Sequence, residues 1–131
     1  MHSLRVHPDV YCICRLAPDA AVPPWASAAG FSSVTRTAEE LSILCCEDGV
    51  PQNVQANRGW RLLSVQGSLD LSAIGVLAGL ATTLARAAVS LLAVSSFDTD
   101  YLLVRETDLP RAVEALIADG YGVRTAASGA S

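Results

Sequence analysis

The sequence predicts an α+β fold, built from antiparallel sheets with helices on one face, on three observations. Of the 131 residues, 51% are hydrophobic and 17% are charged, so the chain can bury a core. The segment from Leu71 to Ala88 carries apolar residues at helical spacing. Short apolar stretches that end at turn residues lie on both sides of this segment, as in β-strands.

The second half of the chain predicts a regular order of elements. Asp70 precedes the first helix as its N-cap, because a carboxylate there accepts hydrogen bonds from free backbone N–H groups. The order is a strand at Trp60 to Gln66, a helix at Leu71 to Ala88, strands at Ser90 to Ser96 and Asp100 to Arg105, a second helix, and a strand at Tyr121 to Thr125. This β-α-β-β-α-β order is that of the ferredoxin-like fold.

The second helix has clear start and stop signals. Thr107 caps it, Pro110 is tolerated in its first turn, and Gly120 supplies a left-handed C-cap. The residues that we expect along its apolar face are Leu109, Val113, Leu116 and Ile117.

The first half predicts a shortened version of the same unit. Strands are expected at Val10 to Leu16, Phe31 to Thr35 and Leu41 to Cys46, with short helical segments at Pro24 to Ala29 and Thr37 to Glu40. Thr37 and Glu40 have the spacing of a capping box. The Gly, Pro, Asn and Gln residues of Asp48 to Gly59 suggest a boundary, so we expect units at 1–58 and 59–131, with Ala126 to Ser131 as a frayed tail.

Charge and hydropathy exclude two classes of partner. The net charge is -4 and the nine cationic residues, all arginine, are scattered, which disfavours nucleic acid. The apolar run from Leu71 to Val94 contains Thr82, Thr83 and Arg86, which are poorly suited to a bilayer. No apolar run of signal-peptide length opens the chain. We therefore expect a cytoplasmic protein that contacts neither nucleic acid nor membrane.

The four cysteines occur as Cys12-x-Cys14 and the pair Cys45-Cys46, without the C-x-x-C spacing of a zinc or redox motif. Cys12 and Cys14 share one face of the first predicted strand, so we interpret them as small core residues and expect no metal or cofactor. A disulfide or thiol switch and a metal site are the alternatives.

Two segments resemble small tandem ACT-domain proteins. They are the run from Gly67 to Leu77 and the run from Val89 to Leu109, which contains Ser-Ser-Phe-Asp-Thr-Asp-Tyr between two strands. The segment from Phe31 to Leu44 fits the same family, so the resemblance spans about residues 10 to 120. Bacterial stand-alone ACT proteins and the CASTOR arginine sensors are similar in these segments.

This resemblance implies a non-enzymatic regulatory module that pairs side by side with another ACT unit and holds a free amino acid at the interface. The ligand-binding positions it implies are Asp70, Leu71, Ser72, Ala73, Ser96, Phe97 and Asp100, with Gly79 and Leu80 offered by the facing domain. The arginine sensors have an acidic residue where this chain has Ala73, so arginine itself is not implied.

The residue chemistry supports such a site independently. A helix N-terminus suits a carboxylate, while Asp98 and Asp100 could hold an ammonium or guanidinium group. A helix cap at Asp70 and a turn at Asp98 are the structural alternatives. We expect a homodimeric small-molecule sensor. The alternative is a protein-interaction or oligomerisation module that binds an unidentified protein and no small molecule.

Enzyme activity is not expected. His2 and His7 lie near the N-terminus with no Cys or Ser partner that the sequence can assign, and no glycine-rich phosphate loop is present. Asp98 and Asp100 could bind magnesium, but such a pair is more typical of turn chemistry.

Overall fold

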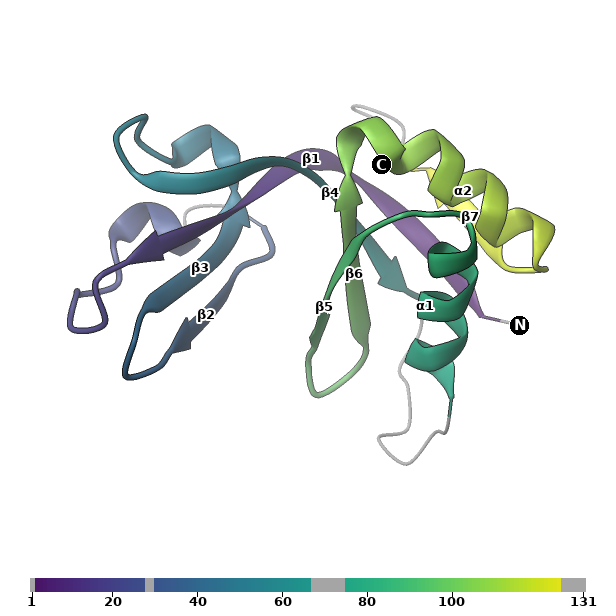
Figure 1. The fold of residues 1–131 in the computed structure, drawn as a ribbon, viewed down its shortest axis with the longest axis horizontal. Coiled ribbons are helices and arrows are strands. Elements are labelled where there is room, and N and C mark those ends of the chain that lie inside the picture. The colour runs from purple at the N-terminus through teal and green to yellow at the C-terminus, as the bar shows by residue number, and fades with distance from the viewer. Residues whose placement is uncertain (1, 28–29, 67–74, 126–131) are drawn as a thin grey trace. The chain divides into compact units, whose positions relative to one another are not determined.

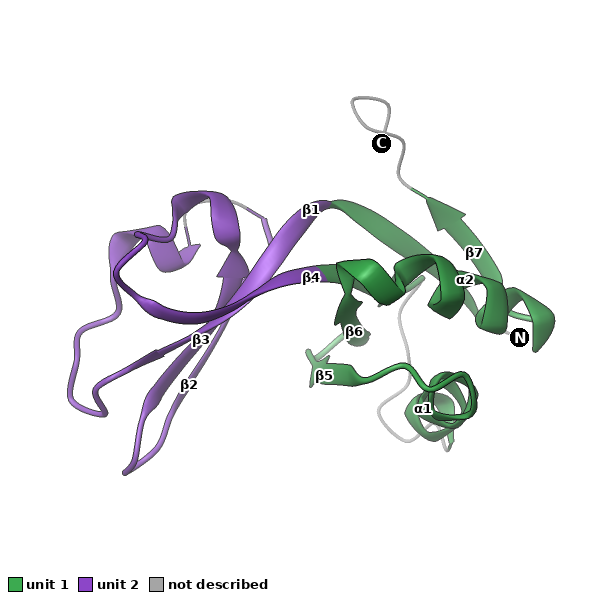
Figure 2. Cartoon of the chain, turned by 45° about the horizontal axis from the view of Figure 1, so that its top comes forward, with its two compact units in different colours: residues 1–8, 61–131 green, residues 9–60 purple. Residues whose placement is uncertain are grey.

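The computed structural model describes residues 2–27, 30–66 and 75–125, which form two compact units (Figures 1 and 2). Unit 1 comprises Met1–Pro8 with Arg61–Ser131, and unit 2 comprises Asp9–Trp60. Strands β1 (Ser3–Leu16) and β4 (Gln55–Val65) each contribute residues to both units. The segment 67–74 and the predicted tail at 126–131 lie outside the described residues.

The units divide the chain differently from the predicted 1–58 and 59–131. Residues 1–8 belong with the C-terminal half because the start of β1 pairs in parallel with β7 (Gly122–Thr125), in the register Ser3 to Gly122 through Val6 to Thr125. Such a long-range parallel pairing leaves no local signal in the sequence. The segment Asp48 to Gly59 also contains the start of β4, and therefore is not wholly a linker.

Unit 1 has the β-α-β-β-α-β order that the sequence predicts. After β4 come α1 (Val76–Arg86), β5 (Leu91–Ser95), β6 (Asp100–Arg105), the 3-10 turn η3 (Glu106–Asp108), α2 (Leu109–Ala118) and β7. Within this unit β7 pairs with β1, β1 neighbours β4, β4 neighbours β6, and β6 pairs with β5. Strand β5 is therefore an edge of the sheet.

The two helices of unit 1 pack on the sheet through one apolar core. Strands β1, β4 and β6 and both helices contribute its buried side chains: Leu4, Val6, Leu63, Val65, Leu80, Leu84, Val89, Leu102, Val104, Ala112 and Leu116. Leu116 is fully buried, whereas the side chain of Ile117 is 55% exposed. Our assignment of Ile117 to the buried face was wrong, because successive helical residues are rotated by about 100°.

Both helix starts differ from the sequence-based expectation. Helix α1 begins at Val76, and its N-cap is Gly75, which has a φ of 81°. Asp70, the expected N-cap, lies outside the described residues. The N-cap of α2 is Asp108 rather than Thr107, because the chain makes one 3-10 turn before the α-helix.

Both helices end in a Schellman motif, in which one residue takes a left-handed conformation. In α1 the Val89 N–H donates to the Leu84 carbonyl at 2.9 Å, and the left-handed residue is Ala88, with a φ of 60°. In α2 the Tyr121 N–H donates to the Leu116 carbonyl at 3.0 Å. Its left-handed residue is Gly120, with a φ of 97°, which confirms the predicted C-cap.

Ala88→Gly is expected to raise the free energy of unfolding by about 1 kcal/mol, because a left-handed conformation strains a residue that has a Cβ atom. The matched exchange Gly120→Ala is expected to lower it by a similar amount. Urea denaturation followed by circular dichroism measures both. If the two exchanges shifted stability in the same direction, left-handed strain would not be the cause.

Unit 2 has two 3-10 turns where unit 1 has helices. Its order is β1, η1 (Pro24–Ser27), β2 (Ser33–Arg36), β3 (Leu41–Cys46), η2 (Glu47–Gly49) and β4, with β2 antiparallel to β3 and β3 antiparallel to β1. Buried side chains of β1, η1, β3 and the residue after η2 form a second core: Cys12, Cys14, Ala26, Leu41, Ile43, Cys45 and Val50.

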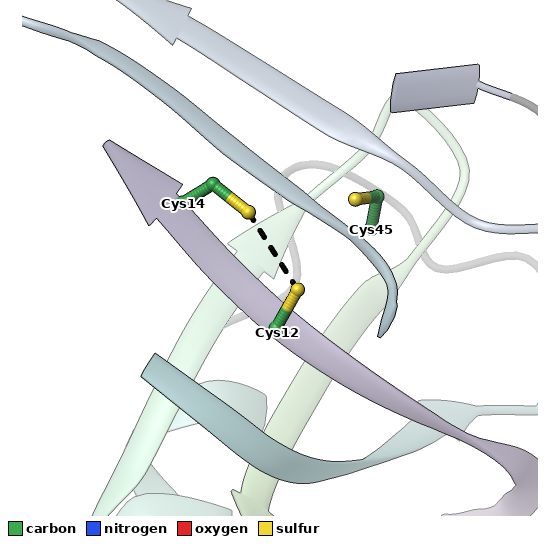
Figure 3. A group of neighbouring side chains, drawn as sticks. All are labelled: Cys12, Cys14 and Cys45. Atoms are coloured by element: carbon green, nitrogen blue, oxygen red, sulfur yellow. Dashed lines mark hydrogen bonds between the residues drawn. The ribbon is translucent and has the colours of Figure 1, made fainter. Parts of the chain in front are cut away.

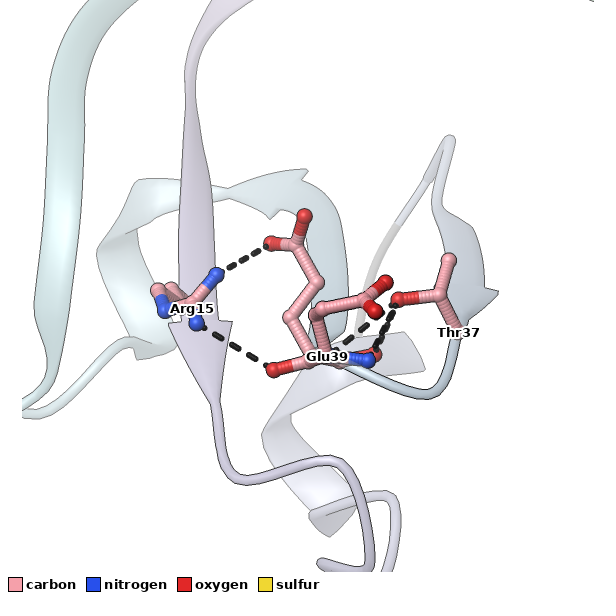
Figure 4. Close-up of polar contacts among 4 residues, drawn as sticks. Arg15, Thr37 and Glu39 are labelled. Carbon is pink, nitrogen blue, oxygen red and sulfur yellow. Dashed lines mark hydrogen bonds and ion pairs between the residues drawn. The ribbon is translucent and has the colours of Figure 1, made fainter.

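The expected helical segment at Thr37 to Glu40 is a turn between β2 and β3, so this prediction was wrong. The Thr37 hydroxyl accepts hydrogen bonds from the Glu39 and Glu40 N–H groups, both at 3.1 Å, as an N-cap does (Figure 4). Arg15 donates to the Glu39 carbonyl at 3.2 Å and pairs with the Glu40 carboxylate at 3.1 Å. The capping hydrogen bonds predicted for Thr37 do form. No helix follows them, because the chain continues into β3, which pairs antiparallel with β2.

Within the described part of the chain, neither α1 nor α2 has the length and apolar character that a membrane-spanning helix needs.

Candidate functional site in the hairpin of unit 1

The predicted binding turn closes the hairpin between β5 and β6. The Ser96 N–H donates to the Thr99 carbonyl at 2.9 Å, and the Ser96 hydroxyl accepts from the Thr99 N–H at 3.3 Å. The Thr99 hydroxyl donates to the Val65 carbonyl at 3.0 Å, which ties the turn to the end of β4. These bonds hold the turn in one conformation and leave Phe97, 83% exposed, at its tip.

Asp100 begins β6 and lies opposite Ser95 in the register of the hairpin. Its carboxylate accepts a hydrogen bond from the Ser95 hydroxyl at 2.5 Å. Asp98 is exposed within the turn. The hairpin thus presents an aromatic ring and a carboxylate at its tip, and a second carboxylate, oriented by a hydroxyl, in the strand pair next to the turn. Such a set can bind a cationic amine through charge-assisted hydrogen bonds.

The two other described candidates, Gly79 and Leu80, lie on α1 and not in the hairpin. Leu80 is fully buried in the core of unit 1, so its side chain is not available to a ligand. Gly79 lines an open pocket of about 390 Å³ between α1 and the residues that follow α2, together with Ala78, Thr82, Thr83, Arg86, Asp119 and Tyr121. Asp119 accepts hydrogen bonds from Thr83 at 2.6 Å and from Arg86 at 2.9 Å, which joins α2 to α1.

The structure thus brings Ser96, Phe97, Asp98 and Asp100 together in one hairpin and puts Gly79 and Leu80 on α1. The remaining predicted residues, Asp70, Leu71, Ser72 and Ala73, lie outside the described residues. The sequence analysis did not predict that Tyr121 lines the pocket beside α1, because it assigned this residue to the last strand. In the structure Tyr121 precedes β7.

Strand β5 forms an uncharged edge of the sheet, which could not be assigned from the sequence. Its residues, Leu-Leu-Ala-Val-Ser, carry no charge and no proline. Its partner is β6, and within the described part of the chain nothing pairs with its outer side. An uncharged edge strand of this kind is a template for pairing with another strand.

His7 has a serine partner that the sequence could not assign. Its Nε2 atom lies 2.9 Å from the hydroxyl of Ser64, which is 57 residues away in the chain. Ser64 is only 6% exposed, and neither residue lines the helix pocket or the pocket of unit 2 described below. The bond joins β1 to β4, and a hydroxyl that is this deeply buried is poorly placed to attack a substrate.

Comparisons with known proteins find similar proteins that cover most of the chain. An ACT-domain family model matches residues 55–118, and a model of another family's N-terminal domain matches residues 9–53. The crystal structure of protein Atu0741 from Agobacterium tumefaciens is similar, with 35% identity, a TM-score of 0.90, and coverage of 95% of this chain and 92% of that one. No curated protein matched the chain in sequence.

More distant structures share the fold. A Vibrio cholerae protein of unknown function, described as a possible transport protein, has 20% identity and a TM-score of 0.73 over 89% of this chain and 88% of that one. The regulatory subunit of aspartate kinase from Thermus thermophilus has 12% identity and a TM-score of 0.63 over 90% of this chain and 97% of that one.

Proposed function

Since the chain belongs to the family of Agobacterium tumefaciens protein Atu0741 and matches an ACT-domain model over residues 55–118, we propose that it is a non-enzymatic regulatory protein that binds a free amino acid. The ligand is held where the ACT domains of two protomers meet, and the protein acts as a cytoplasmic sensor. Structural similarity to the regulatory subunit of aspartate kinase supports a regulatory rather than a catalytic role.

The observation that carries this proposal is the course of the chain from β5 into the hairpin turn. Strand β5 is an uncharged edge, and it leads directly into Ser96, Phe97 and Asp98. A second copy that adds its own β5 to this edge would be related by two-fold symmetry, as in most homodimers. That pairing would bring two binding turns to the same interface.

The hairpin offers groups suited to a zwitterion. The carboxylates of Asp98 and Asp100 suit the ligand's ammonium group, and Phe97 offers an aromatic face. The ligand's carboxylate would meet the segment that precedes α1, where the resemblance implies Asp70 to Ala73. The chain has Ala73 where the arginine sensors have an acidic residue, so their selectivity for arginine does not carry over to this chain.

We infer that unit 2 is a shortened ACT-like unit. Its β, 3-10, β, β, 3-10, β order repeats that of unit 1 with each helix reduced to a short turn. Turns of this length cannot present an N-terminal binding site for a carboxylate, which supports assigning the amino-acid site to unit 1.

A thermal-shift screen of the purified protein against the twenty amino acids tests the proposed function. A ligand at about 100 times its Kd adds roughly 2.7 kcal/mol of stability, which raises the Tm by several degrees. We expect one amino acid, or a few of similar chemistry, to produce this rise. If no amino acid shifts the Tm, the alternative of a protein-interaction module is favoured.

Asp100→Ala is expected to abolish the shift that the selected amino acid causes, while the Tm without ligand falls little because the carboxylate is only partly buried. Glu106→Ala, which removes an exposed carboxylate of the same unit at the start of η3, is the matched control and should keep the full shift. An undiminished shift in Asp100→Ala would show that this carboxylate does not contact the ligand.

A further inference from the structure

Three thiols of unit 2 converge in its core. Cys12 and Cys14 lie on the same face of β1, and Cys45 on β3 is the register partner of Cys12 (Figure 3). The Cys12 and Cys14 sulfurs are 3.6 Å apart, and all three sulfurs lie within 4.8 Å of one another. Cys12 is 0% exposed, and Cys14 and Cys45 are each 1% exposed.

These separations match the spacing of a metal–thiolate site. Metal–sulfur bonds of about 2.3 Å place sulfurs that share one ion about 3.8–4.0 Å apart. The three sulfurs therefore need to move by less than about 1 Å to coordinate one ion. We propose that Cys12, Cys14 and Cys45 form a binding site for monovalent copper in unit 2.

The number and type of donors favour Cu(I) over zinc. Structural zinc sites almost always have four ligands, and the group of side chains that could hold a metal ion among the described residues offers only three sulfurs. Three soft sulfur donors without nitrogen or oxygen select a soft ion such as Cu(I). The surrounding side chains are apolar, among them Ala26, Leu41 and Ile43, so they keep competing water away.

A compensating charge lies close to the site. Cys14 and Arg58 both line an open pocket of about 510 Å³, with Arg15, Glu40 and Asn57 among its other walls. Arg58 is held by a hydrogen bond to the Pro51 carbonyl at 3.1 Å. Its guanidinium offsets part of the negative charge that a copper–thiolate centre carries.

The apo thiols are poorly suited to the alternative role of reactive cysteines. Burial raises the pKa of Cys12 to about 12 and that of Cys45 to about 11, so both are protonated at neutral pH. Burial also raises the pKa of Cys14, although Arg58 opposes the effect. A protonated thiol is a weak nucleophile, whereas a bound metal ion displaces the proton directly.

Titration of the reduced protein with Cu(I) under nitrogen, in competition with a chromogenic copper chelator, tests the proposal. We expect one tightly bound Cu(I) per chain, with release of the thiol protons. X-ray absorption at the copper edge should show a first shell of three sulfurs. A first shell containing nitrogen or oxygen, or the absence of a 1:1 complex, would overturn the assignment, as would tighter binding of Zn(II) than of Cu(I).

Single substitutions of the cysteines identify which sulfurs bind the ion. Cys12→Ala, Cys14→Ala and Cys45→Ala should each weaken Cu(I) binding by more than the roughly 10–100-fold that loss of an outer-shell partner costs. Cys46→Ala is the matched control, because Cys46 follows Cys45 on the same strand and therefore faces the opposite side. Circular dichroism checks that each variant is folded. The sulfur coordination of the wild-type protein provides a test even if a variant unfolds.

Two outcomes separate this site from other possibilities. Loss of two titratable thiols in air, with no 1:1 copper complex under nitrogen, would mean that two of the cysteines form a disulfide instead. Equal loss of copper binding in Cys46→Ala and Cys45→Ala would mean that the ion binds elsewhere. Neither result bears on the amino-acid site, which lies in unit 1.

Discussion

Ala93→Pro is expected to convert the proposed homodimer to a monomer. The Ser96 N–H bonds to the Thr99 carbonyl, so in the antiparallel register Ala93 is a residue whose own N–H points away from β6. Proline at this position removes an outward N–H and leaves the bonds between β5 and β6 in place. Light scattering should report a mass of 13.7 kDa for the variant and about twice that for the wild type.

Ala93→Ser is the matched control, because serine is also small and keeps the backbone N–H. It should remain dimeric, and Ala93→Lys, which puts a charge at the exposed edge, should again be monomeric. If Ala93→Pro stayed dimeric with an unchanged circular dichroism spectrum, pairing through β5 would be refuted. A monomeric wild type at micromolar concentration would refute the homodimer altogether.

The same variant links assembly to ligand binding. If the amino acid lies between the turns of two protomers, Ala93→Pro loses the ligand-induced rise in Tm along with the dimer. A monomeric variant that retains the full rise would place the ligand within a single ACT domain.

Leu116→Ala is expected to lower the free energy of unfolding by about 2–5 kcal/mol, because it leaves a cavity in the core that joins α2 to the sheet. The next residue on the same helix supplies the control. Ile117 is 55% exposed, so Ile117→Ala should cost less than about 1 kcal/mol. Urea denaturation followed by circular dichroism measures both, and similar losses would show that the two side chains are equally buried.

The hairpin of the candidate site could be predicted well from local sequence. The bounds of β6 at Asp100–Arg105 and of β3 at Leu41–Cys46 match the predicted strands residue for residue. Both are short apolar stretches between turn residues, so local preference and tertiary pairing agree. The turn at Phe97 to Thr99 follows for the same reason.

Other elements were predicted less well because tertiary pairing decided them. The first strand was expected at Val10 to Leu16 but begins at Ser3, since β7 pairs with its early residues. Strand β4 begins at Gln55 rather than Trp60, within a segment whose composition suggests a linker. Thr37 makes the hydrogen bonds of a helix cap inside a hairpin turn.

The group of Cys12, Cys14 and Cys45 could be predicted only in part from the sequence. The spacing of Cys12 and Cys14 places them on one face of a strand, but only the pairing of β1 with β3 places Cys45 opposite Cys12. A shift of one residue in that register would turn Cys46 toward them in place of Cys45.

The sequence by itself determined the element order of unit 1 and the hairpin turn, because each depends on spacing within a few residues. The tertiary structure decided which residues belong to each unit, which strand forms the exposed edge, and which side chains meet across the sheet. Those outcomes depend on pairing between segments far apart in the chain, for which hydrophobic periodicity carries no information.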